Sequence, residues 1–345
     1  MTQAAAIRPH RTEPWWLWVL KQRATQLALA GWLVIAIAIP LLAGPSLPFD
    51  RPSLADQPVG TQILNAHSLV LLALMVIALA YVVTQDRVVK DIAARAPARA
   101  IAAVEVGVLV AYGVLIQAGG VIVGQLIGSV PLSGHMPGSI YAVRETITPA
   151  QTAVWMTYNF VLYAAIPYLV FRWRGYSNEA LCLTSLDKAK DALVIIVVLA
   201  FEGAVELAGN GGAFFALNTN QKLIGMALSI GINFFGVVLP VMIYLYAILL
   251  PRFLKLSGSV MTTIVLCGLG YAAMHTLDAW TVYDGLRNGA LSVMFLLLQY
   301  FGPGMVKAVL TLRTGNAWVH ALAYHAFAPH AWTDAPTMVR IFGVR

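Results

Sequence analysis

Long apolar stretches separated by short polar segments dominate the pattern of this chain. A helix needs roughly twenty apolar residues to cross the hydrocarbon of a bilayer. We predict membrane-spanning helices over residues 25–44, 68–84, 100–128, 151–171, 192–209, 223–250, 257–276, 290–310 and 317–333. Strand barrels would show short alternating stretches instead, and lipid offers the backbone no hydrogen-bonding partners. The pattern predicts an all-α, polytopic transmembrane helix bundle of eight or nine spans.

Composition and charge support this interpretation and suggest an orientation. The chain is 59% hydrophobic and 11% charged, whereas soluble domains contain about 25% charged residues. Short cytoplasmic loops collect Lys and Arg. With a cytoplasmic N-terminus, the inner segments contain sixteen of the 22 Lys and Arg residues and the outer segments contain six. We therefore predict a multi-pass integral membrane protein surrounded by lipid, and we expect its membrane to be the bacterial inner membrane.

The net charge of +7 does not point to nucleic acid, because the basic residues are spread over five inner segments. We expect no nucleic-acid partner. The segments between the spans are too short to form independent domains. The chain divides into a basic, Trp-rich interfacial tail (1–24), N-terminal membrane helices (25–150), a membrane core (151–333) and a short C-terminal tail (334–345).

Three glycines at four-residue spacing mark one face of the third predicted span. Gly120, Gly124 and Gly128 would let another segment approach this helix closely. Packing within the monomer and a dimer seam are both open, and packing within the monomer is favoured.

Two glutamates lie inside the fifth predicted span, where an ionisable side chain costs about 3 kcal/mol on insertion scales. Glu202 and Glu206 are four residues apart and share a helix face. Like charges this close repel in a medium of low dielectric constant, so at least one should be protonated or paired. A structural, hydrogen-bonded carboxylic acid and a functional carboxylate remain equal alternatives. Glu105, near the inner end of the third span, is expected to extend toward the headgroups.

Histidines end the seventh predicted span and occupy the last one. His275 closes the seventh span, whereas His320, His325 and His330 follow each other at five-residue steps. Such steps scatter side chains around a helix, so the three do not predict a three-ligand metal face. Whether a metal or another cofactor is bound stays open. Depth along the spans allows His275, His325, Glu202 and Glu206 to share one cavity.

Three short runs between residues 160 and 330 resemble motifs of a known family. Tyr271-Ala-Ala-Met-His275 is similar to a Phe-x-x-x-His motif, and the run from Arg313 to His325 is similar to the approach to a final His-x-x-x-Asn motif. Leu249-Leu250-Pro251-Arg252 is similar to the stretch that follows a Glu-Glu-x-x-x-Arg motif. These are features of the CPBP family, the CAAX proteases and bacteriocin-processing proteins. The resemblance implies a membrane peptidase in which a glutamate and a histidine activate water.

The chain departs from this family at several positions. Val241 and Met242 stand where the resemblance places the two glutamates, and Tyr246 stands where it places the arginine. Pro329 falls on the final asparagine. Of the implied site, His275 and His325 remain, and two imidazoles alone do not supply the carboxylate that such a general base requires.

Two hypotheses follow from the matches and the departures. In the first, the protein lacks peptidase chemistry and acts as an accessory membrane subunit that binds another membrane protein or a peptide. In the second, Glu202 or Glu206 supplies the missing carboxylate, and the protein is a divergent intramembrane endopeptidase that uses His275 and His325.

Overall fold

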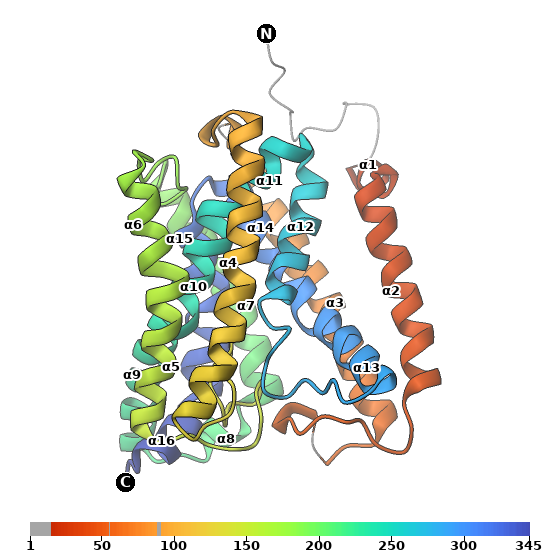
Figure 1. Cartoon of the computed structure of the whole chain (residues 1–345), viewed down its shortest axis with the longest axis vertical. Coiled ribbons are helices and arrows are strands. Elements are labelled where there is room, and N and C mark those ends of the chain that lie inside the picture. Colours follow the sequence, from red (N-terminus) through yellow and green to blue (C-terminus); the bar gives the residue numbers. More distant parts are fainter. Residues whose placement is uncertain (1–14, 55, 88–90) are drawn as a thin grey trace.

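The structure is a computed structural model that describes residues 15–54, 56–87 and 91–345, and it contains only helices and loops within these ranges. Most of the predicted basic tail, residues 1–14, lies outside the described residues. The helices stand side by side along the long axis of the molecule (Figure 1). The prediction of an all-α fold is confirmed.

Among the described residues, seven helical stretches are long and apolar enough to cross a membrane, which makes the chain a polytopic membrane protein. Three are single helices near the N-terminus: α2 (Arg23–Leu42), α3 (Val59–Val83) and α4 (Arg99–Leu126). The others are α5 with α6 (Pro149–Trp173), α7 (Lys188–Asn210), α9 to α11 (Thr219–Ser257) and α13 with α14 (Leu286–Thr314).

The two remaining predicted spans are helical but shorter than expected. The seventh span corresponds to α12 (Val260–Ala273), which has 14 residues. The last span corresponds to α15 (Ala317–His320) and two π-helical segments, Ala321–His325 and Ala328–Thr333. Pro329 lacks an N–H and crowds the preceding turn, which explains why this tract is not one continuous helix.

Several spans contain a π-helical segment just before a proline. Phe160–Ala165, Phe234–Val238, Met242–Leu249 and Leu297–Phe301 each end two residues before one. A wider turn accommodates the carbonyl that the proline ring crowds and the missing N–H leaves unpaired. The segment Leu297–Phe301 carries the buried side chains of Gln299 and Tyr300.

The shorter elements lie between or beyond these spans. They are α1 (Trp15–Lys21), α8 (Gly212–Phe215), α16 (Ala335–Phe342) and the 3₁₀ turns Pro52–Leu54 and Ala93–Arg95. Within α9 to α11 the α-helical parts are α9 (Thr219–Asn233), α10 (Leu239–Val241) and α11 (Leu250–Ser257). Likewise, α5 (Pro149–Asn159) and α6 (Ile166–Trp173), and α13 (Leu286–Leu296) and α14 (Gly302–Thr314), flank π-helical segments.

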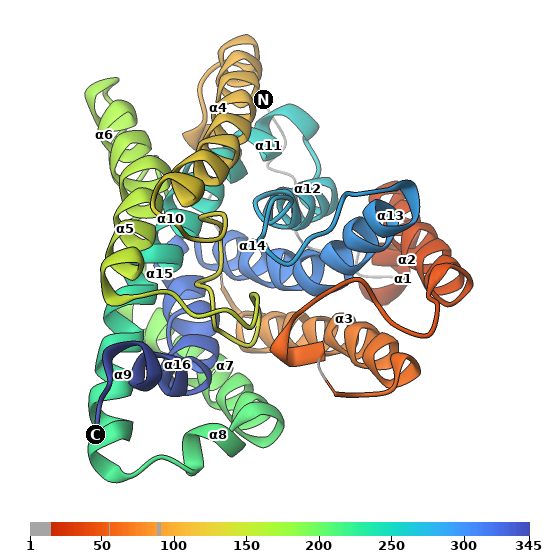
Figure 2. The ribbon, with the colours of Figure 1, turned by 60° about the horizontal axis from the view of Figure 1, so that its bottom comes forward.

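The centre of the bundle is built from the C-terminal half of the chain. Figure 2 shows α14 between α3 and α12, whereas α2 lies at the periphery. In the most apolar window of α9 to α11, 83% of the residues are buried, compared with 6% for α2. The outward faces of the peripheral helices are apolar and suited to lipid.

Basic residues of the predicted inner loops gather at one end of the bundle. Arg87 forms an ion pair with Asp191 at 2.6 Å, and Arg95 donates to the carbonyl of Gly315 at 2.7 Å. The C-terminus lies at the other end from α1 (Figure 1). This arrangement agrees with the alternation of loops expected from the Lys and Arg residues, and a cytoplasmic N-terminus stays a prediction.

Candidate functional site

The glycines of α4 allow the loop that follows this helix to fold back and pack against it. Leu132 N donates to the Gly120 carbonyl at 3.0 Å, and Ser129 N donates to the Gly124 carbonyl at 2.9 Å. A Cβ at Gly120 would lie 2.3 Å from the Leu132 oxygen, so only glycine allows this approach. These glycines pack within the monomer, as the favoured interpretation expected.

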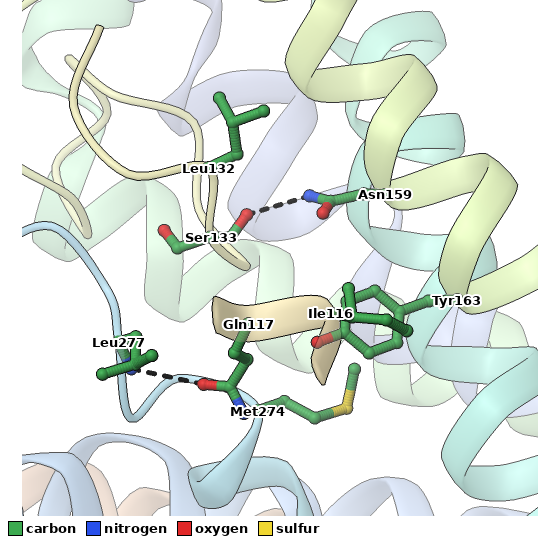
Figure 3. A pocket seen from close by; sticks show the side chains of 8 residues that line it. All are labelled: Ile116, Gln117, Leu132, Ser133, Asn159, Tyr163, Met274 and Leu277. Carbon is green, nitrogen blue, oxygen red and sulfur yellow. Dashed lines mark hydrogen bonds between the residues drawn. The ribbon is translucent and has the colours of Figure 1, made fainter. Parts of the chain in front are cut away.

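The same loop is then fixed against α5. Trp155 Nε1 and Asn159 Nδ2 both donate to the Ser133 carbonyl, at 2.8 and 2.9 Å, and Figure 3 shows the second of these bonds. The next residue, Gly134, touches the ring of His275, where a Cβ would lie 2.3 Å from Cε1. This contact places His135 beside His275.

Three buried side chains form what we call the His–Asp cluster: His135, His275 and Asp278. His275 Nδ1 lies 3.0 Å and His135 Nδ1 lies 3.5 Å from Asp278 Oδ2. One ligand atom from each residue lies within 4.8 Å of the others, which suits a single metal ion. Gln117 holds the turn after α12: its Nε2 donates to the Ala273 carbonyl at 2.9 Å, and its Oε1 accepts from Leu277 N at 3.3 Å, the bond that Figure 3 shows.

Aromatic residues enclose the His–Asp cluster. The Tyr300 ring stacks on His275 with centroids 3.9 Å apart. Its hydroxyl lies 3.2 Å from Asp278 Oδ2 and 3.4 Å from His135 Nδ1. Trp280 Nε1 also donates to Asp278 Oδ2, at 3.2 Å. In the described part of the chain, Asp278 Oδ1 and His275 Nε2 are buried and have no partner.

The protonation states of the two loop residues suit a metal ligand set. Burial lowers the pKa of His135 to about 3, so its imidazole is neutral near pH 7. Burial alone would raise the pKa of the Asp278 carboxyl. The electrostatic effect of His275 and the hydrogen bonds from both imidazoles outweigh burial and hold this pKa below its usual range. Neutral imidazoles and an ionised carboxylate are the forms that bind metal.

The predicted site residue His325 lies near the His–Asp cluster but not in it. Tyr271 stands between them, with its ring 5.0 Å from that of His275 and 6.1 Å from that of His325. The ring of His325 is 5.4 Å from that of His330, whose Nδ1 lies 2.9 Å from Asp334 Oδ2. His275 and His325 therefore flank one tyrosine.

His320 lies elsewhere, in contact with Thr311 and Tyr246. The three histidines of the last tract therefore do not share a single face, in agreement with their five-residue steps.

The two predicted glutamates take different environments. Glu202 is buried, and its Oε2 has no partner among the described residues. Glu206 accepts hydrogen bonds from Tyr141 at 3.1 Å and Asn210 at 2.9 Å. The Tyr141 ring is 5.7 Å from that of His135. Glu206 is thus linked to the cluster through a tyrosine, whereas the carboxylate that contacts His275 is Asp278.

The sequence interpretation missed His135, Asp278 and Tyr300. One signal was present, because His275-x-x-Asp278 and His330-x-x-x-Asp334 place an acid about one helical turn from a histidine. His135 and Tyr300 carry no local signal, since only the folding of the chain brings them to Asp278.

A small pocket adjoins the segments that carry the cluster, and Figure 3 shows the residues that line it. Its lining residues come from α4, the loop after it, α5, the π-helical segment that follows α5 and the turn after α12: Ile116, Gln117, Leu132, Ser133, Asn159, Tyr163, Met274 and Leu277. Ser133 and Met274 directly precede Gly134 and His275 in sequence, so the pocket adjoins the residues that hold both imidazoles.

The geometry of the cluster fits a tetrahedral ion such as Zn²⁺. Bonds of 2.0 to 2.2 Å separate neighbouring ligand atoms by about 3.3 Å, and the two measured separations from Asp278 Oδ2 are 3.0 and 3.5 Å.

Comparison with known proteins gives no family for this chain. No family model, no curated protein and no solved structure matches it. The function is therefore argued from the site and its surroundings.

Proposed function

We propose that this membrane protein is a metal-dependent hydrolase whose substrate lies within the bilayer. The observation that carries the proposal is the His–Asp cluster, in which the Nδ1 atoms of two imidazoles converge on Asp278 Oδ2. Buried polar atoms are nearly always paired, yet Oδ1 of the same carboxylate has no partner among the described residues and is available to an ion. Catalytic zinc sites use three protein ligands and leave one position for water.

Each residue of the cluster has a chemical task in this proposal. His135, His275 and Asp278 would hold the ion, which would supply Lewis-acid activation of water near neutral pH. The Tyr300 hydroxyl lies within 3.4 Å of two ligand atoms and is placed to hydrogen-bond the water or the developing oxyanion. Trp280 fixes the carboxylate, as outer partners of metal ligands do.

The resemblance to CPBP proteins makes a peptide bond the first substrate to test. In this proposal Asp278 supplies the carboxylate that is missing at Val241 and Met242. The pocket beside Ser133 and Met274 has space for about one water molecule next to the ligand residues.

Metal binding is the direct test. The purified protein is loaded with Zn²⁺ in detergent, freed of excess ion and analysed by mass spectrometry, with affinity measured by chelator competition. We expect one ion per chain, and about 100-fold or greater loss of affinity in His135→Ala, His275→Ala and Asp278→Ala. His67→Ala is the control, because His67 accepts a hydrogen bond from Trp32 outside the cluster. Equal binding by all four variants, or no binding of Zn²⁺, Mn²⁺ or Fe²⁺ by the wild type, would overturn the proposal.

Hydrolysis is tested in vesicles that contain quenched fluorescent single-span peptides, with a fluorogenic phospholipid as a second substrate. We expect cleavage that 1,10-phenanthroline stops and added Zn²⁺ restores. Tyr300→Phe should retain the ion and cleave about tenfold more slowly, because it removes one hydrogen bond to the reacting centre.

A second candidate function is an accessory subunit without chemistry. It is favoured by the positions of the family's first motif, where Val241, Met242 and Tyr246 are buried and the Tyr246 hydroxyl donates to the Gly304 carbonyl at 2.9 Å. This candidate expects capture of a membrane partner that His275→Ala and Asp278→Ala leave intact, with no hydrolysis by the metal-loaded protein.

A further inference from the structure

Arg51 is a buried arginine without an acidic partner in the described part of the chain. It lies in the segment that joins α2 to α3, and it is 1% exposed. Its Nη2 makes a single long hydrogen bond, 3.4 Å, to Gln299 Oε1. Its Nε and Nη1 have no partner. A fully charged side chain is thus buried with most of its donors unused.

The other inward-facing arginines have better partners than Arg51. Arg87 pairs with Asp191 at 2.6 Å, Arg252 pairs with Glu105 at 2.5 Å, and Arg313 donates to Thr84 Oγ1 at 2.9 Å and to the Thr84 carbonyl. Burying an unpaired guanidinium is costly, and an arginine side chain keeps its charge in proteins. The Trp280 ring, 4.5 Å from the guanidinium carbon, attracts the charge but offers no acceptor oxygen. Arg51 therefore lacks an anion.

The position of Arg51 connects it to the His–Asp cluster. Its guanidinium covers the ring of Trp280, whose Nε1 donates to Asp278. Its partner Gln299 precedes Tyr300, which touches the cluster. One aromatic side chain separates the unpaired donors from the proposed metal ligands.

Charge balance then indicates what the site would accept. A divalent ion held by two neutral imidazoles and Asp278 leaves a net charge of +1, and Arg51 adds another. We propose that Arg51 forms a subsite for a phosphate group of the substrate, placed beside the metal centre. This inference rests on the proposed function. Arg offers a planar fork of N–H donors that matches phosphate oxygens, and it uses the nitrogens that are unpaired here.

The probe is inorganic phosphate, and the measurement is the thermal unfolding midpoint in detergent at constant ionic strength. Phosphate should raise the midpoint of the metal-free and Zn²⁺-loaded protein relative to chloride, because a ligand that binds the folded state stabilises it. Arg51→Gln should weaken phosphate binding about tenfold or more, and Arg51→Lys should weaken it less, since it keeps the charge. Arg287→Gln is the matched control, because Arg287 already donates to the Leu42 carbonyl at 2.8 Å.

Two further arms identify the source of the phosphate and separate the two proposals. Nanodiscs of phosphatidylcholine with and without phosphatidic acid show whether a lipid headgroup occupies the subsite. Zinc affinity is measured for every variant without phosphate, and Arg51→Gln should bind Zn²⁺ like the wild type. The subsite is refuted if neither phosphate nor phosphatidic acid changes the unfolding midpoint of the wild type, or if acetate alone changes it. It is also refuted if phosphate raises the midpoint of Arg51→Gln as much as that of the wild type. If the wild type does not bind zinc, the metal centre is refuted instead of the subsite.

Discussion

Two buried charged clusters at different places in the bundle differ in how completely their atoms are paired. Near the end of the bundle that carries most basic residues, Glu105 accepts from Arg252 at 2.5 Å, Arg174 at 2.7 Å and Tyr176 at 2.9 Å. Both of its carboxylate oxygens are thus used. In the His–Asp cluster, by contrast, four groups from His135, His275, Trp280 and Tyr300 crowd one oxygen of Asp278, while its other oxygen has no partner among the described residues.

The difference is the one expected between a cluster that stabilises the fold and a cluster that binds a ligand, as proposed for the His–Asp cluster. A buried ion pair holds its place when its charges and lone pairs are satisfied internally, and Glu105 meets this condition. The expectation that Glu105 extends toward the headgroups is therefore wrong. The turn after α6 and helix α11 supply its partners inside the protein. In the proposed function, a bound ion explains why Asp278 Oδ1 has no partner among the described residues.

The largest effect is expected at the structural cluster. Glu105→Ala leaves Arg252 buried beside the empty position of its acid, and we expect a loss of about 3–5 kcal/mol in the free energy of unfolding. The measurement is an SDS titration of the protein in mixed micelles. Glu105→Leu combined with Arg252→Met is the control, because removing both charges should recover much of the stability.

The same titration on His275→Leu sharpens the comparison. This change removes an unpaired Nε2, and Asp278 keeps Trp280 and Tyr300 as donors, so the unfolding free energy should change by less than about 1 kcal/mol. If His275→Leu destabilised the protein as much as Glu105→Ala, both clusters would be structural.

A medium effect is expected where the glycine contact orients the cluster. Gly134→Ala would place a Cβ 2.3 Å from His275 Cε1 and push the imidazole away from Asp278. Displacing a ligand through its outer contacts typically costs 10–100-fold in metal affinity, and we expect about tenfold by chelator competition. Gly107→Ala on α4 is the control, because nothing lies within 4 Å of its added Cβ. Unchanged zinc affinity in Gly134→Ala would contradict the assignment of His275 as a ligand.

The fold could be predicted from sequence because hydropathy and loop charge act over whole segments. Length alone identified the long spans, and Gly120 and Gly124 indicated a close approach. The pattern failed for residues 317–333, where the chain is apolar enough for a span but Pro329 prevents a continuous helix. Apolar composition reports the surroundings of a segment, whereas hydrogen bonding decides its continuity.

The site could be predicted only in part. His275 was found by its motif and lies in the cluster. His135 belongs to a loop whose position depends on contacts with α4 and α5, and no periodicity encodes such contacts. Glu202 and Glu206 were singled out because they are costly within a span, which is correct as a statement about burial. Burial alone does not tell which histidine a carboxylate will meet.

The smallest effect is expected at these two glutamates, and it decides between the two forms of hydrolase. In the metal-dependent form, Glu206 has no role beyond accepting hydrogen bonds from Tyr141 and Asn210, and the amide oxygen of a glutamine can still accept the one from Tyr141. Glu206→Gln and Glu202→Gln should therefore change zinc affinity and the rate of peptide cleavage by less than about threefold. If one of them instead carries the catalytic proton with His275 and His325, its Gln variant must abolish cleavage, because an amide cannot take and return a proton. Both glutamate variants are compared with Asp278→Asn, with all three proteins expressed at the same level. Abolition by either glutamate variant with full zinc occupancy would show that the carboxylate of the reaction is not Asp278.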